Sequence, residues 1–189
     1  MLEDLRTVYQ RDPALHHGRR AEVLLYPGLW AIWGYRLAHR LYRRGLPFLP
    51  RALSQFVRGL TGIEIHPGAT IGRRLFVDHG AAVVIGETAV IGDDVTLYHR
   101  VTLGGRGWQH DAKGSRRHPH VGDRVVLGVG ATVLGDVHIG HDAHIGAHAL
   151  VLRDVPAHAR VSAPRSVVST PSSTDEENFP CPSTPACLI

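Results

Sequence analysis

The chain has 189 residues, of which 43% are hydrophobic and 20% charged, a composition that supports one packed domain and a smaller appendage. It contains no apolar run near the roughly 18 residues of a membrane span. It also has no signal-peptide pattern in MLEDLRTVYQRDPAL and no cysteine outside Cys181 and Cys187, which favours a cytoplasmic protein without disulfides or a Cys-rich zinc site. The net charge of +4 includes 21 basic residues, nearly all of them arginine. The sequence has no dense basic run with interleaved aromatic residues, so a nucleic-acid partner is not predicted.

Residues 1–62 are predicted to form an N-terminal helical region. Apolar side chains recur there at three- and four-residue steps, the pattern of an amphipathic helix with one packing face. They are Leu24, Leu25, Leu29, Ile32, Trp33, Leu37 and Leu41. Pro47 and Pro50 interrupt the pattern, and a shorter helix is expected over residues 49–60.

Residues 63–165 follow a six-residue period instead. A branched aliphatic residue recurs at Ile65, Ile71, Val77, Ile85, Ile91, Leu97, Leu103, Val121, Leu127, Val133, Ile139, Ile145 and Val151. This period predicts a parallel β-helix, in which each six residues form one short strand and one turn, and three such units form one coil. We expect the aliphatic side chains at the corners of the coil, pointing inward and stacked about 4.8 Å apart along the axis.

Two segments fall outside this repeat. Residues 104–120, GGRGWQHDAKGSRRHPH, lack an aliphatic position and are expected to loop out of the coil, where function concentrates on rigid scaffolds. Residues 166–189 are rich in Ser, Thr and Pro and are expected to form a disordered tail. The predicted domains are therefore a helical region at 1–62, a repeat domain at 63–165 and a tail at 166–189.

Local motifs associate the repeat with a family. Residues 63–79 read IEIHPGATIGRRLFVDH and are followed by GETAVIG at 86–92, VTLGG at 101–105 and RHP at 117–119. This series closely resembles the serine acetyltransferase family over about residues 11–156. The resemblance implies an α+β fold, with an N-terminal helical region before a left-handed parallel β-helix. It also implies transfer of an acetyl group from acetyl-CoA to the hydroxyl of L-serine, the first step of cysteine biosynthesis.

The resemblance implies a catalytic pair. His79, in the sequence FVDHG, matches the general base that takes the proton of the serine hydroxyl, a task suited to a side chain whose pKa lies near neutral pH. Glu64 matches the acidic position that orients this base, where many relatives carry Asp. The alternative for His79 is a turn histidine without a role.

Four further residues match positions that hold the amino acid. They are Asp78, Asp12, Arg117 and His118, which supply anions for the ammonium group and cations for the carboxylate. Ordinary surface charge is the alternative for Asp78 and Arg117, and a helix cap is the alternative for Asp12. Glu87 is interpreted as structural.

Coenzyme A is expected along a groove between neighbouring coils. Gly104, Gly105 and Ala147 match family positions there, and His144 stands where some relatives carry a lysine near the CoA phosphates. No metal is expected. The loop residues Trp108 and His110 receive no role.

The resemblance also implies partners. Active sites of the family lie between the subunits of a homotrimer, whereas members with a longer helical region form hexamers. L-cysteine is an expected feedback inhibitor. The terminal Ile189 matches the residue that binds O-acetylserine sulfhydrylase, with an unused tail as the alternative.

Three rival functions remain open on sequence alone. An acetyltransferase for another hydroxyl acceptor would keep the histidine base. A γ-type carbonic anhydrase would need three histidines around Zn²⁺, and we interpret His138 and His144 as part of one solvated face instead. The third rival is a non-enzymatic scaffold that only binds the sulfhydrylase.

Overall fold

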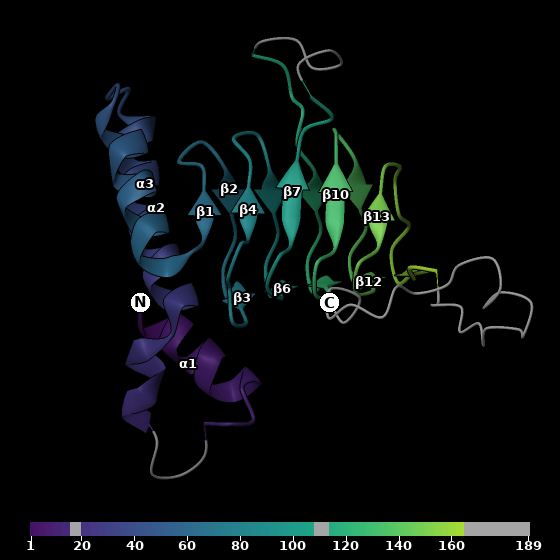
Figure 1. Cartoon of the computed structure of the whole chain (residues 1–189), viewed down its shortest axis with the longest axis horizontal. Coiled ribbons are helices and arrows are strands. Elements are labelled where there is room, and N and C mark those ends of the chain that lie inside the picture. Colours follow the sequence, from purple (N-terminus) through teal and green to yellow (C-terminus); the bar gives the residue numbers. More distant parts are fainter. Residues whose placement is uncertain (16–19, 108–113, 165–189) are drawn as a thin grey trace, which may run out of the picture.

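The computed structural model describes residues 1–15, 20–107 and 114–164. A helical region precedes a parallel β-helix, and the chain advances along the β-helix axis one coil at a time (Figure 1). The described helices are α1 (Leu2–Arg11), the 3₁₀ helix η1 (Arg20–Leu25), α2 (Pro27–Arg43) and α3 (Leu49–Thr61). None of the helices in this part of the chain has the length and apolar character that crossing a membrane requires.

Short parallel strands form the three walls of the β-helix, which we call sheets A, B and C. Sheet A contains β1 (Glu64–Ile65), β4 (Val84–Ile85), β7 (Thr102–Gly104), β10 (Thr132–Leu134) and β13 (Leu150–Val151). Sheet B contains β2 (Thr70–Ile71), β5 (Val90–Ile91), β8 (His120–Val121) and β11 (His138–Ile139). Sheet C contains β3 (Phe76–Val77), β6 (Thr96–Leu97), β9 (Val126–Leu127), β12 (His144–Ile145) and β14 (Arg160–Val161). The chain visits A, B and C in turn, so the turns form an AB, a BC and a CA corner.

The register confirms the six-residue period. In sheet A, Ile85 pairs with Ile65 on one side and with Leu103 on the other, so that aliphatic residues of successive coils stack. Leu103 pairs in turn with Val133, and the long segment after β7 is therefore an insertion at the AB corner. The predicted aliphatic positions are buried, apart from Ile71, which is only partly buried.

One detail of the prediction was wrong. The aliphatic residues lie within the strands, as the second residue of each, and not at the corners. The residue that precedes a strand is also buried and is often smaller, as with Ala69, Ala89 and Val95, all less than 2% exposed. Short side chains suit the tight turns between walls, whereas the first coil, which the helices cover, holds the larger Ile63 and Leu75 at this position.

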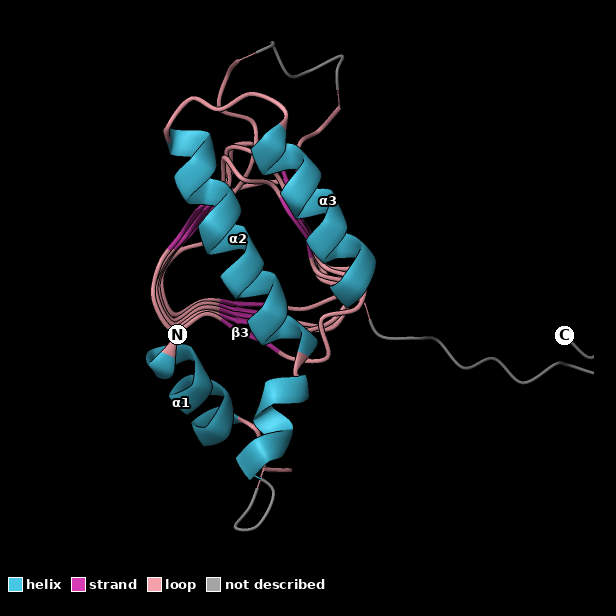
Figure 2. Cartoon of the chain, turned by 90° about the vertical axis from the view of Figure 1, so that its left-hand side faces the viewer, coloured by secondary structure: helices cyan, strands magenta, loops and turns pink. Residues whose placement is uncertain are grey.

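Helices α2 and α3 cover the first coil, as the view along the β-helix shows (Figure 2). The Tyr35 hydroxyl donates a 2.6 Å hydrogen bond to the carbonyl of Ala69, and burial raises the pKa of Tyr35 to about 12. A Cβ atom at Gly28 would lie 2.6 Å from the carbonyl oxygen of Val77. Glycine therefore allows α2 to begin directly against β3.

The predicted apolar stripe of the helical region is only partly the packing face. Leu29 and Ile32 are buried, but Leu25 is 78% and Leu37 50% exposed. Leu25 belongs to the 3₁₀ helix that ends before Pro27, so it does not continue the face of α2. Both exposed leucines line an apolar groove between α2 and α3.

The expectation that His138 and His144 share one face was also wrong. His138 lies in sheet B and His144 in sheet C, because one hexapeptide step carries the chain around a corner to the next wall. Histidines with this spacing therefore point in different directions. The histidine rings that do face each other in this region are those of His120 and His138, on neighbouring coils of sheet B, with centroids 5.2 Å apart and planes inclined at 52°.

The interior stack gives a stability prediction. Leu127 is fully buried between Leu97 and Ile145, so Leu127→Ala should lower the free energy of unfolding by about 2–5 kcal/mol through lost contacts and a residual cavity. Its strand neighbour Val126 points outward, and Val126→Ala should cost clearly less. Urea unfolding of both variants tests this, and equal losses would contradict the inward stacking of Leu127.

Candidate active site

The turn after β3, at the CA corner, carries the predicted base. His79 adopts a left-handed backbone conformation with φ of 57°, and its side chain is 74% exposed. The imidazole Nε2 atom lies 3.7 Å from Oδ1 of Asp78, and the ring meets that of His99 edge-on with centroids 5.9 Å apart. The turn thus places the His79 imidazole beside a carboxylate and an edge of a second imidazole.

Asp12 approaches the same corner from α1, with Tyr26 as its partner. Its Oδ1 atom accepts a 2.7 Å hydrogen bond from the Ala14 amide, and its Oδ2 atom accepts a short one from the Tyr26 hydroxyl. The pKa of Tyr26 is raised, first by burial, then by the hydrogen bond to Asp12 and by the charges of Asp12 and Asp78. The two aspartates therefore face one neighbourhood, which favours a cationic group.

Tyr26 was not among the residues predicted from sequence. Its partner Asp12 is 14 residues away, across a segment whose path no periodicity predicts. A tyrosine directly before Pro27 is an ordinary helix start, so no sequence signal distinguishes it.

A second group forms at the AB corner, where the long loop returns to the coil. Arg117 donates a 2.8 Å hydrogen bond to Glu87, and the His118 ring is only 7% exposed. The Thr88 hydroxyl accepts hydrogen bonds from the amides of Arg117 and His118 at 3.0 and 3.2 Å. Thr88 is thus a link that sequence reasoning missed, because its partners lie 29 and 30 residues further along the chain.

The contacts of His118 fix the state of its ring. The Thr88 amide lies 3.1 Å from Nδ1, and because an amide can only donate, Nδ1 accepts. The neutral ring therefore carries its proton on Nε2. A Cβ atom at Gly86 would lie 2.0 Å from the ring, so only glycine leaves room for the imidazole there.

Glu64 has other partners than the predicted one. Its carboxylate pairs with Arg51 at 3.0 Å and with Arg58 at 3.3 Å, both from α3. Within the part of the chain that is described, Glu64 and His79 form no ion pair. The role of Glu64 in orienting His79 stays a prediction.

The predicted CoA-binding residues are divided between two corners. Gly104 ends β7 and Gly105 begins the loop at the AB corner. Ala147 lies exposed at the CA corner, and His144 points outward from β12 in sheet C. Trp108, His110 and Ile189 lie outside the described residues.

One chain therefore does not bring all predicted residues together. Sheet A faces the viewer in Figure 1, with the loop rising from one edge and β3, followed by Asp78 and His79, at the opposite edge. Between them lies the outer face of sheet A, where Val84 is 37% and Leu150 is 60% exposed. We call the two groups candidate half-sites; they lie on opposite edges of sheet A, whose outer face carries Val84 and Leu150 beside the polar side chains of Glu64, Thr102 and Thr132.

The described residues contain no group of three or more His, Cys, Asp or Glu side chains that could hold a metal ion. The chemistry available at the two corners is that of a histidine, carboxylates, an arginine and polar backbone groups. This set suits proton transfer and recognition of a zwitterion.

Comparison with known proteins agrees with these observations. Residues 118–153 match the family model described as bacterial transferase hexapeptide (six repeats). The serine acetyltransferase of Mycobacterium tuberculosis is 49% identical over 185 residues, which are 98% of this chain and 76% of that protein.

Two solved structures resemble the whole fold. Serine acetyltransferase isoform 3 from Entamoeba histolytica, in complex with cysteine, matches with a TM-score of 0.82 at 36% identity over 92% of this chain and 60% of that chain. The soybean serine acetyltransferase complexed with serine matches with a TM-score of 0.79 at 42% identity over 88% of this chain and 67% of that chain. Both chains are thus longer than this one.

The role of Thr88 can be tested without a substrate. Thr88→Val keeps the shape of the side chain but leaves the amides of Arg117 and His118 without their acceptor, so stability should fall by about 1–3 kcal/mol. The amide ¹H shifts of Arg117 and His118 should move upfield in Thr88→Val, whereas the ¹⁵N shifts of the His118 ring should show Nδ1 unprotonated in both proteins, because the backbone amide of residue 88 remains as its donor. Thr70→Val, at an exposed position of β2, is the matched control. Unchanged amide shifts of Arg117 and His118 in Thr88→Val would contradict this role.

Proposed function

The chain belongs to the serine acetyltransferase family, and we propose that His79 is the general base with which it transfers an acetyl group from acetyl-CoA to the hydroxyl of L-serine. The observation that carries this proposal is the position of His79. It stands on an exposed turn beside Asp78, with a second carboxylate, Asp12, facing the same neighbourhood.

The reaction needs one proton to move twice. The imidazole of His79 takes the proton of the serine hydroxyl as the oxygen attacks the thioester carbonyl of acetyl-CoA. The tetrahedral intermediate then collapses, the carbon–sulfur bond breaks, and the CoA thiolate receives that proton from the imidazolium. The carboxylate of Asp78, 3.7 Å from Nε2, stabilises the charge that the ring carries in between.

The zwitterion of serine matches the two half-sites. Asp12 and Asp78 supply the negative charge for its ammonium group, and Arg117 with the Nε2–H group of His118 supplies donors for its carboxylate. The ion pair of Arg117 with Glu87 and the bonds of Thr88 hold these donors in place. The soybean relative is solved with serine and the Entamoeba relative with cysteine, and we propose that both amino acids compete for this site here.

Acetyl-CoA, as co-substrate, requires a long groove. His79 and Ala147 both stand two residues after a core aliphatic of sheet C, so they fall on one line along the CA corner, three coils apart. At about 4.8 Å per coil, this line is about 14 Å long, a span that suits an extended pantetheine chain. Gly104 and Gly105 would approach the cofactor from the opposing corner of a second copy.

A homotrimer would complete the site. In a closed ring of identical subunits, the outer face of sheet A turns toward the three-fold axis, and the CA corner of one copy meets the AB corner of the next. The exposed Val84 and Leu150 on that face support such burial, as does the 74% exposure of the His79 side chain in a single chain. A hexamer, a cytoplasmic location and binding of the sulfhydrylase through Ile189 stay predictions.

The rival functions have less support. The named relatives are serine acetyltransferases. An acetyltransferase for a sugar or another uncharged hydroxyl acceptor would have no use for Asp78 and Arg117 at opposed corners. A γ-type carbonic anhydrase needs three clustered histidines.

Substitution of His79 tests its role as the general base. In His79→Ala, kcat for serine-dependent release of CoA thiol from acetyl-CoA should fall by about 10²–10⁴-fold, because no positioned group remains to take the proton. His158→Ala, an exposed histidine on the BC corner, should retain full activity. Parallel reactions with homoserine in place of serine, and without any acceptor, are the controls for serine dependence. Serine-dependent rates that survive in His79→Ala would sink the assignment of the base.

Mixed oligomers of two inactive variants test whether the active site lies between two subunits. His79→Ala and Arg117→Ala should each be inactive, but co-expression should restore about a quarter of wild-type activity. Random mixing makes about three-quarters of the trimers mixed, and each mixed trimer contains one intact interface of its three. His79→Ala mixed with Asp78→Asn alters the same half-site twice and should restore nothing. If the first mixture also stays inactive in purified mixed oligomers, each site belongs to one chain.

A further inference from the structure

Asp12 owes its position to the end of α1, and α1 is held by charges on both of its sides. The buried Asp4 binds the Arg36 guanidinium of α2 through both oxygens, at 2.5 and 2.7 Å. Burial alone would raise the pKa of Asp4, but hydrogen bonds from Arg36 and Trp33 outweigh it and lower the pKa. This pair fixes the start of α1 against α2.

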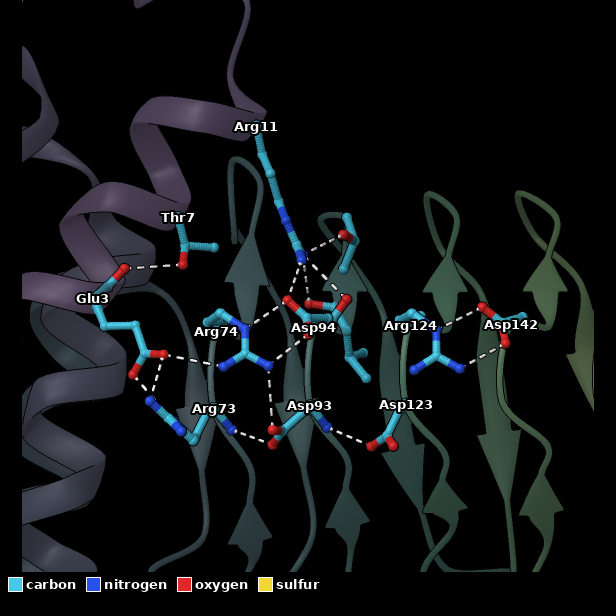
Figure 3. A network of polar contacts seen from close by, with 12 residues as sticks. Glu3, Thr7, Arg11, Arg73, Arg74, Asp93, Asp94, Asp123, Arg124 and Asp142 are labelled. Carbon is cyan, nitrogen blue, oxygen red and sulfur yellow. Dashed lines mark hydrogen bonds and ion pairs between the residues drawn. The ribbon is translucent and has the colours of Figure 1, made fainter.

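The other side of α1 faces the BC corner of the β-helix, where charged side chains form a continuous ladder (Figure 3). Glu3 receives Arg73 at 2.9 Å and Arg74 at 3.0 Å. Arg74 in turn binds both oxygens of Asp94 at 2.7 and 2.8 Å and holds the pKa of that carboxyl below its usual range. The ladder ties α1 to the first two coils.

Arg11 joins this ladder from the last turn of α1. Its guanidinium donates to Oδ1 of Asp94 at 3.0 Å, to the Thr96 hydroxyl at 3.1 Å and to two backbone carbonyls of the same turn. Figure 3 shows the side chain extended from the helix end to this turn. The residue that follows Arg11 is Asp12, the first residue beyond the helix.

We infer that Arg11 is a positioning residue for the amino-acid site, which together with the Tyr26 hydroxyl holds the carboxylate of Asp12 where the ammonium group of the substrate binds. This inference rests on the proposed role of Asp12. Arg11 fixes the backbone of Asp12 from the side of the second coil, and Tyr26 fixes its Oδ2 atom from the start of α2. Neither residue was predicted from the sequence.

The hydrogen bonds of Arg11 restrain the end of α1 and, with it, the position of Asp12. Its four bonds are spread over the Asp94–Thr96 turn, so they restrict rotation of the helix end as well as its distance. A carboxylate that drifts by about 1 Å from its partner costs up to about 10²-fold in the reaction it serves. Loss of Arg11 should therefore weaken serine binding, while the proposed acetyl-CoA line, which runs along the CA corner away from α1 toward Ala147, stays intact.

The test separates the two Michaelis constants. In Arg11→Met, KM for L-serine should rise about tenfold, with kcat and KM for acetyl-CoA within about twofold of wild type. Arg11→Lys keeps the charge beside Asp94 and should recover part of the loss. Tyr26→Phe should raise KM for serine about fivefold, because one hydrogen bond to the carboxylate is lost.

The matched control is Arg124→Met. Arg124 forms a two-bond pair with Asp142 at 2.8 Å on the same corner, and among the described residues neither member of this pair is hydrogen-bonded to α1. This variant should leave both constants unchanged. A rise of KM for serine in Arg124→Met equal to that in Arg11→Met would show a general effect of the charged corner and overturn the inference.

The variant Asp12→Asn separates a failure of the positioning role of Arg11 and Tyr26 from a failure of the proposed role of Asp12 itself. If Asp12→Asn leaves KM for serine unchanged, the proposed role of Asp12 is wrong. If Asp12→Asn raises it but folded Arg11→Met and Tyr26→Phe do not, the role of Asp12 stands and the positioning inference fails. Melting temperatures of all variants identify any that are unfolded, and Tyr26→Phe keeps the test decisive if Arg11→Met is among them.

Discussion

The stacking of each coil on the next is the interaction on which the rest of this structure depends. Each described strand pairs in parallel with its counterpart in a neighbouring coil, and the aliphatic residues that point inward fill the interior. Register is therefore fixed by burial, because a slip of one residue would turn every aliphatic side chain outward. Residues at equal positions in the period then line up along the axis. This alignment sets His79, His99 and Ala147 on one edge.

The sequence predicted this alignment well because it depends on a local period. It could not predict contacts between residues whose spacing is set by loops. Thr88 meets Arg117 only because the inserted segment returns to the AB corner, and Tyr26 meets Asp12 only because α2 begins against β3. The stripe of the helical region was misjudged at Leu25 for a similar reason. Its periodicity ignored the break at Pro27, which separates the 3₁₀ helix from α2.

The same rigidity explains why the two candidate half-sites of one chain stay separate. A β-helix cannot bend to bring its corners together, so residues on opposite edges of sheet A stay apart in any single copy. In the proposed trimer, a rigid wall that exposes Val84 and Leu150 is paired with another wall, and the two edges meet across the contact. The polar groups support such a division: Asp12 and Asp78 offer carboxylates on one side, and on the other side Arg117, held by Glu87, and the His118 ring offer hydrogen-bond donors. A zwitterion can bridge a pair of carboxylates and a set of donors better than it fits either alone.

In the proposed site, the helical region is a part of the site and not an appendage to it. Residue 62 separates two secondary-structure patterns, yet Asp12 and Tyr26 lie before it while Asp78 lies after it, and all three face one neighbourhood. Helices beside a rigid coil are the elements that could shift, and here α1 is fixed on one side by the buried Asp4–Arg36 pair and on the other by Arg11 and Glu3. The charged ladder occupies the BC corner, where it leaves sheet A and both half-sites uncovered. Its placement therefore allows firm anchoring of α1 without blocking the edges at which substrates would enter.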